Sequence, residues 1–79
     1  MNRAINQINI DIYRSDTNHD KYLVVEHGVQ RPNLNDPDLQ SVHMFSENRP
    51  LTPSNFTFYA DAVRDLTLGL GYHIHSQGI

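Results

Sequence analysis

The chain has 79 residues, no cysteine and a formal net charge of −3, and 38% of its residues are hydrophobic. A chain of this length forms one small domain, here residues 1–79, and buries only about 60% of the surface that it exposes when unfolded. Its six lysine and arginine residues are scattered, which argues against direct binding of nucleic acid. No apolar run approaches the roughly 18 residues of a membrane span, and the first residues lack the apolar stretch of a signal peptide. We therefore expect a cytoplasmic protein without a membrane anchor.

Two strands are predicted in the first third of the chain. Isoleucines alternate with polar or aromatic residues at positions 8, 10 and 12, which is the pattern of a half-buried strand over residues 7–13. Residues 21–28 form a second strand with apolar side chains on both faces. Residues 14–20 between them are rich in Asp, Asn and Ser, which favour turns. Together they predict an antiparallel hairpin.

A long connection and a third strand follow. Residues 28–40 contain Pro32 and Pro37, each of which favours extended geometry in the residue before it. Connections of this length are uncommon and often functional. Apolar and polar residues alternate again over 41–46, which predicts the third strand, and residues 47–50 are expected to form a turn.

A helix is predicted over residues 51–70. Thr52 suits the N-cap, Pro53 suits the first helical position, and Gly69 suits a left-handed residue that ends the helix. The apolar stripe of this helix comprises Phe56, Tyr59, Ala60, Val63, Leu66 and Leu70.

A short last strand, Tyr72 to His75, completes an α+β fold in the order β-β-β-α-β. The expected sheet is mixed or antiparallel, has three or four strands and carries one helix on one face. The other face is expected to be bare and rich in aromatic residues, which is typical of a contact site. The residues expected on it are Tyr13, Tyr22, Val24, His43 and Phe45.

Two groups of polar residues have spacings that could support chemistry. His73 and His75 share one face of the last strand, so both imidazoles can reach one metal ion if His43 or His27 supplies a third ligand. Polar residues on the open side of an edge strand explain the pair more simply, so no metal site and no cofactor are assigned. Asp61 and Asp65 lie one helical turn apart, but Arg64 between them is typical of a solvated, charged face. The chain contains no P-loop, nucleophile elbow, dinucleotide fingerprint or HExxH motif, and we do not expect an enzyme.

In its architecture the chain resembles the anti-CRISPR proteins of phages and mobile elements. The resemblance consists of small size, acidity, absence of cysteine, a hairpin (Ile8–Tyr13 and Tyr22–His27) and a helix packed on it (Phe56–Leu70). It covers most of the chain and includes no specific motif, so no functional residue is transferred. It implies an inhibitor in the host-cell cytoplasm that binds a Cas protein or complex.

The leading hypothesis is thus a protein-binding inhibitor that acts by surface contact. The residues predicted to contact the partner are acidic or aromatic: Asp11, Tyr13, Tyr22, Glu26, Asp36, Asp38, Asp61 and Asp65. An acidic surface would accelerate the encounter with a basic groove. The first alternative is a structural or accessory protein that forms a homodimer through the bare sheet face. The second is a metal-binding protein that uses His73, His75 and a third histidine.

Overall fold

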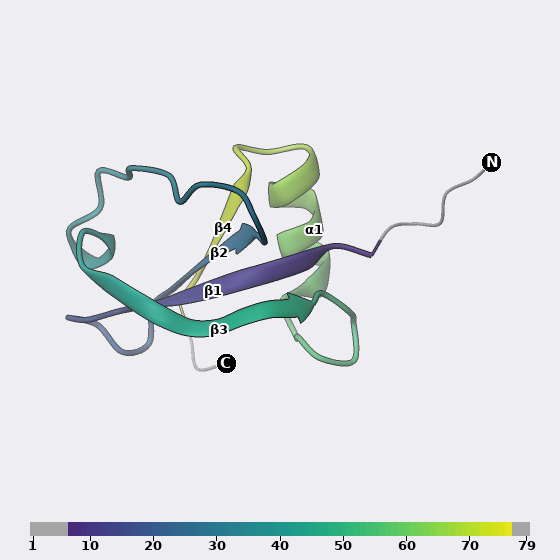
Figure 1. Cartoon of the computed structure of the whole chain (residues 1–79), viewed down its shortest axis with the longest axis horizontal. Coiled ribbons are helices and arrows are strands. Elements are labelled where there is room, and N and C mark those ends of the chain that lie inside the picture. The colour runs from purple at the N-terminus through teal and green to yellow at the C-terminus, as the bar shows by residue number, and fades with distance from the viewer. Residues whose placement is uncertain (1–6, 77–79) are drawn as a thin grey trace.

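The computed structural model describes residues 7–76, which form a four-stranded antiparallel sheet and one α-helix (Figure 1). The predicted α+β class with one helix is confirmed. The elements in chain order are β1 (Asn9–Ser15), β2 (Tyr22–Glu26), the short 3₁₀ helix η1 (Pro37–Leu39), β3 (Val42–Pro50), α1 (Tyr59–Thr67) and β4 (Tyr72–His75). The strand order is β3-β1-β2-β4, so β3 and β4 are the two edges. The helix among these residues is too short and too polar to cross a membrane.

The predicted hairpin is present, but β1 begins and ends two residues later than predicted, and β2 is shorter than the predicted strand over residues 21–28. Ser15 ends the strand, is fully buried and pairs with Val42 of β3. Its hydroxyl oxygen accepts hydrogen bonds from the backbone N–H groups of Thr17 and Asn18, at 3.1 and 2.9 Å. The serine side chain therefore starts the turn and is itself part of the sheet.

Strand β3 runs through residues 47–50, where the sequence predicted a turn. Two register shifts in its pairing with β1 place extra β3 residues opposite single β1 residues, as in β-bulges. At one of them Asn48 has a φ of 55°, its backbone N–H donates to Asp11 Oδ1 at 2.9 Å, and its side-chain oxygen accepts from Asn9. Turn-forming residues thus remain in the strand because β1 supplies hydrogen-bond partners for the bulge.

The helix is much shorter than predicted, and it begins at Tyr59. Thr52 does cap a turn, because its Oγ1 accepts from the N–H of Asn55 at 3.2 Å, but that turn is separate from α1. Phe56 and Phe58 are both buried in the core. Residues two apart point about 200° apart on a helix and cannot both face one core. Burial of both rings therefore keeps residues 51–58 out of the helix.

The end of the helix also differs from the prediction. Positive φ occurs at Gly71 (90°), not at Gly69. Gly69 is required for space, because a Cβ there would lie 2.9 Å from the backbone oxygen of Asp65. The predicted apolar stripe is wrong at two positions: Ala60 and Leu70 are exposed, and Ala62 is the buried alanine of α1.

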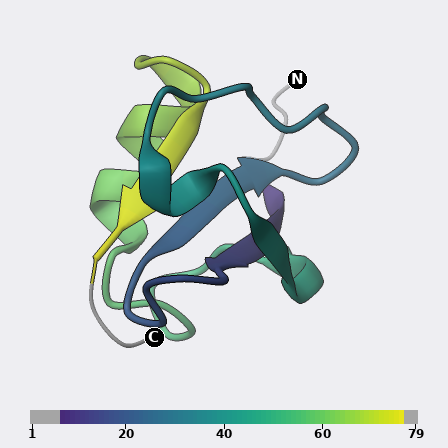
Figure 2. The same ribbon diagram turned by 90° about the vertical axis from the view of Figure 1, so that its left-hand side faces the viewer.

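The face of the sheet opposite the helix is not bare. The helix-side core contains Tyr22 and Val24 together with Ile10 and Ile12 of β1. On the other face Leu23 and Val25 pack against Leu39 of η1, and partly buried Tyr13, Leu34, Val42, Tyr72 and Ile74 surround them. Figure 2 shows the connection between β2 and β3 crossing this face. The prediction of an uncovered aromatic face is therefore wrong, because the long connection itself supplies the second layer.

Candidate functional site at the β4 edge

Strand β4 forms a regular edge of the sheet. It pairs with β2 on one side, from Tyr22 opposite His75 to Val25 opposite Tyr72, and no strand among residues 7–76 lies on its other side. The opposite edge, β3, is interrupted by bulges and carries charged residues, both of which discourage pairing with another chain. Strand β4 has neither a bulge nor a Lys, Arg, Asp or Glu residue. Among the described strands it is the better template for an added strand.

Two leucines project from the turn that leads into this edge. Leu68 is 84% exposed and Leu70 is 81% exposed, more than any other large apolar side chain in residues 7–76. Leu68 is the C-cap residue of α1, and Leu70 lies between Gly69, where only a glycine fits, and Gly71 with its positive φ. The backbone of this turn therefore directs apolar side chains into solvent, where they do not contribute to the stability of the fold.

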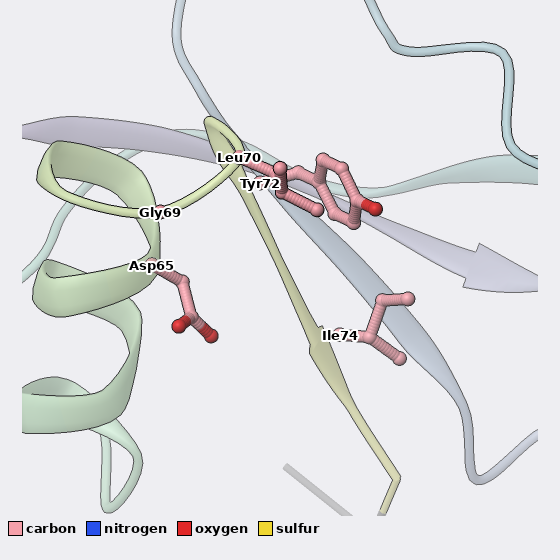
Figure 3. Close-up of a pocket in the computed structure, with 5 residues that line it drawn as sticks. All are labelled: Asp65, Gly69, Leu70, Tyr72 and Ile74. Atoms are coloured by element: carbon pink, nitrogen blue, oxygen red, sulfur yellow. The ribbon is translucent and has the colours of Figure 1, made fainter.

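A pocket of about 300 Å³ lies beside Leu70, and Figure 3 shows the residues that line it. Asp65 extends from α1 toward β4, whereas Tyr72 and Ile74 project from the strand itself. Gly69 and Leu70 complete the lining. The pocket thus combines apolar walls with one carboxylate.

The carboxylate of Asp65 is ionised at neutral pH. Its Oδ2 accepts a hydrogen bond from His73 Nδ1 at 2.7 Å, and Arg64 Nε lies 3.6 Å from Oδ1. The hydrogen bond from His73 is the main reason that the pKa of Asp65 lies below its usual 3.8, and the charge of Arg64 acts in the same direction. The pocket therefore has an ionised carboxylate at one side, and a cationic group of a partner would share it with Arg64.

His73 is packed like a residue of the core. It is 6% exposed, its ring stacks on Phe58 at 5.2 Å between centroids, and its Nε2 has no hydrogen-bond partner among residues 7–76. His75 shares the same face, with the two imidazole rings 6.2 Å apart. The proposed third ligands are engaged elsewhere: His43 contacts Asp16 at 2.6 Å and His27 contacts Asp11 at 2.9 Å. Within residues 7–76 no third metal-ligating side chain joins His73 and His75, so the histidine site of the second alternative is not assembled.

The residues predicted to contact a partner occupy several surfaces and part of the interior. Asp11 and Tyr22 are buried, so little of either side chain is accessible to a partner. Tyr13 is half-buried, and the guanidinium of Arg31 lies 5.1 Å from the centre of its ring. Glu26 is exposed at the end of β2. None of these four borders the pocket.

The other four predicted contact residues divide between two layers. Asp36 and Asp38, in and beside η1, bind Lys21 at 2.7 and 3.5 Å, and the bond to Lys21 lowers the pKa of Asp36. Asp61 and Asp65 belong to α1 on the other side of the sheet, and Asp61 lies 3.3 Å from Arg64. Of the eight predicted contact residues, Asp65 is the one that borders the pocket. The contact role of all eight stays a prediction.

The hydrophobic pattern did not indicate the exposure of Leu68, and it placed Leu70 in the buried stripe of the helix. A local signal was available, because Leu70 lies between two glycines that interrupt a helix and expose the residue between them. Comparison with protein-family models, curated proteins and solved structures found no match to this chain.

Proposed function

We propose that this protein acts by binding another protein, and that the β4 edge with its leucines and pocket is the contact surface. The observation that carries the proposal is the exposure of Leu68 and Leu70 beside an edge strand. Moving one leucine side chain from water into an interface contributes roughly 1.5–3 kcal/mol. Two such side chains, one of which lines the pocket, provide the apolar centre of a small interface.

The geometry favours a partner segment in extended conformation. Such a segment adds to β4 through backbone hydrogen bonds, and alternate side chains then reach the same side. One apolar side chain fits the pocket of about 300 Å³ between Leu70, Tyr72 and Ile74. A lysine or arginine beside it would meet the ionised Asp65. The preferred motif is thus a short strand that carries an apolar residue and a basic residue.

The class of partner follows from the anti-CRISPR resemblance. Proteins that bind nucleic acid present lysine and arginine along the groove that holds the phosphates. A chain with a net charge of −3 and a carboxylate in its contact pocket is suited to such a surface. We infer an inhibitor that blocks a Cas protein or complex in the cytoplasm of the host cell.

The test compares three forms of the full chain in a bacterial lysate that contains a CRISPR system. The double variant Leu68→Glu/Leu70→Glu changes two side chains that are more than four-fifths exposed, so the fold is retained. Val29→Glu is the matched control, because Val29 is an apolar residue 50% exposed on the β2–β3 connection. Mass spectrometry of the captured proteins should find a Cas component with the wild type and Val29→Glu, and not with the double variant. Capture of the same proteins by all three forms, or of none by the wild type, contradicts the proposal.

Self-association through the same edge is the second candidate, because a free edge strand pairs equally well with its own copy across a two-fold axis. Light scattering on the purified chain separates the two. A dimer that the double leucine variant converts to a monomer favours self-association, whereas a monomeric wild type favours a different partner.

A further inference from the structure

Three potential metal ligands meet on the sheet away from the β4 edge. Asp11 lies in the middle of β1, His27 directly follows β2, and Glu47 lies in the bulged part of β3. One ligand atom of each lies within 4.8 Å of the ligand atoms of the other two, and no other group of three in residues 7–76 meets this condition. We propose that Asp11, His27 and Glu47 bind a divalent transition-metal ion such as Zn²⁺ or Mn²⁺.

The carboxylate of Asp11 is buried, and only one of its two oxygens is hydrogen-bonded within residues 7–76. Its side chain is 9% exposed, and burial of a carboxylate is costly unless its charge is compensated. Its two hydrogen-bonding contacts, from the Asn48 N–H and with His27 Nδ1, are both made by Oδ1 at 2.9 Å. Within residues 7–76 no hydrogen bond reaches Oδ2. This oxygen is therefore available to a ligand.

The bulge in β3 is what brings the third ligand to this place. Ile10 pairs with Arg49 and Ile12 pairs with Ser46, so two residues of β3, Glu47 and Asn48, lie opposite Asp11. A regular ladder would place only one residue there, and bulges commonly redirect a side chain toward a functional site. The N–H of Asn48 also holds the Asp11 carboxylate in position, as a second layer of hydrogen bonds does around metal ligands.

The donor set and its spacing suit a transition metal. One imidazole and two carboxylates are ligands that Zn²⁺, Mn²⁺ and Fe²⁺ accept. Neighbouring ligand atoms around a metal with bonds of about 2.0–2.2 Å are about 3–3.5 Å apart. One ligand atom of each residue already lies within 4.8 Å of the ligand atoms of the other two, and the exposed side chains of His27 and Glu47 can rotate to reach the spacing of metal ligands. Three protein ligands leave at least one position open to solvent.

A hydrogen-bonded pair of His27 and Asp11 accounts for two of the three residues but not for Glu47. A second carboxylate close to the buried Asp11 adds negative charge to a place that holds one histidine, and like charges repel at short range. A divalent cation removes that repulsion. The proximity of Glu47 is therefore the feature that distinguishes a metal site from an ordinary ion pair.

The test is calorimetric titration of the full chain, without an affinity tag and stripped of metal, with Zn²⁺ and separately with Mn²⁺. We expect one ion per chain with at least one of the two metals. His27→Ala and Glu47→Gln should each weaken binding by about ten-fold or more. Both residues are exposed, so these variants should keep the fold, and circular dichroism verifies this. Asp11 is left unchanged because it also anchors the β3 bulge.

The matched controls are His43→Ala and Glu26→Gln, an exposed histidine and an exposed glutamate outside the cluster. Both should bind the metal as the wild type does. Absence of binding to the wild type, unchanged affinity in His27→Ala and Glu47→Gln, or an equal loss in the controls would overturn the proposal. His75→Ala is included because loss of binding there would assign the metal to the histidines of β4 and refute the site at Asp11.

Discussion

Leu39 holds the β2–β3 connection against the sheet, and its replacement by alanine tests whether that connection forms the second layer of the fold. The side chain is 6% exposed and packs with Leu23 and Val25. Leucine to alanine substitutions in cores cost about 2–5 kcal/mol, with smaller values where neighbours can move into the cavity. The neighbours Leu34 and Val42 are only partly buried and can move, so we expect Leu39→Ala to lower the free energy of unfolding by about 2–3 kcal/mol.

This loss is large for such a small chain. At about 0.05–0.15 kcal/mol per residue, 79 residues correspond to a total of roughly 4–12 kcal/mol. Because 1 kcal/mol shifts the Tm of a domain of this size by about 4–8 °C, we expect a fall in Tm of about 10–20 °C. Thermal and urea unfolding followed by circular dichroism measure both quantities.

Val29→Ala is the control for Leu39→Ala, because Val29 belongs to the same connection but is 50% exposed. It should change the free energy of unfolding by no more than about 0.5 kcal/mol. Equal stability of the two variants would mean that the connection does not cover the sheet, and the second face would then be open as the sequence predicted.

Two further predictions concern single polar side chains. Because the pKa of Asp65 is lower in the folded state than its usual 3.8, its stabilising effect is complete above that pH and is lost as the pH falls through the folded-state value. The stability advantage of the wild type over Asp65→Asn should therefore shrink below pH 3.8, and a constant difference across that range would contradict the His73–Asp65 bond. Ser15→Ala removes the acceptor for two backbone N–H groups beside a fully buried position, so urea unfolding should show a loss of about 1–3 kcal/mol. A loss no greater than that of an exposed variant such as Ser54→Ala would contradict this role.

The candidate site was only partly predictable from the sequence. The strand Tyr72–His75 was predicted with the bounds that the structure has, because alternation over four residues is a local pattern. The exposure of Leu70 was missed, because the apolar spacing of the helix was extended through a glycine that ends it. The sequence pattern indicated His27 as a potential metal ligand, but it did not indicate that Asp11 and Glu47 lie beside it. Its proximity to Glu47 depends on a bulge and on β1 lying between β2 and β3.

Local patterns were enough to predict the elements that repeat within a few residues: the hairpin strands, the last strand, and the part of the predicted helix that forms α1, Tyr59–Thr67. Contacts between distant segments set where those elements end and which of them pack together. The burial of Phe56 and Phe58 shortened the helix, and pairing with β1 extended β3 through residues 47–50. Packing of Leu39 on Leu23 and Val25 covered the second face of the sheet. Each of these outcomes depends on contacts between distant parts of the chain, and hydrophobic spacing within one segment carries no information about which distant segment will cover it.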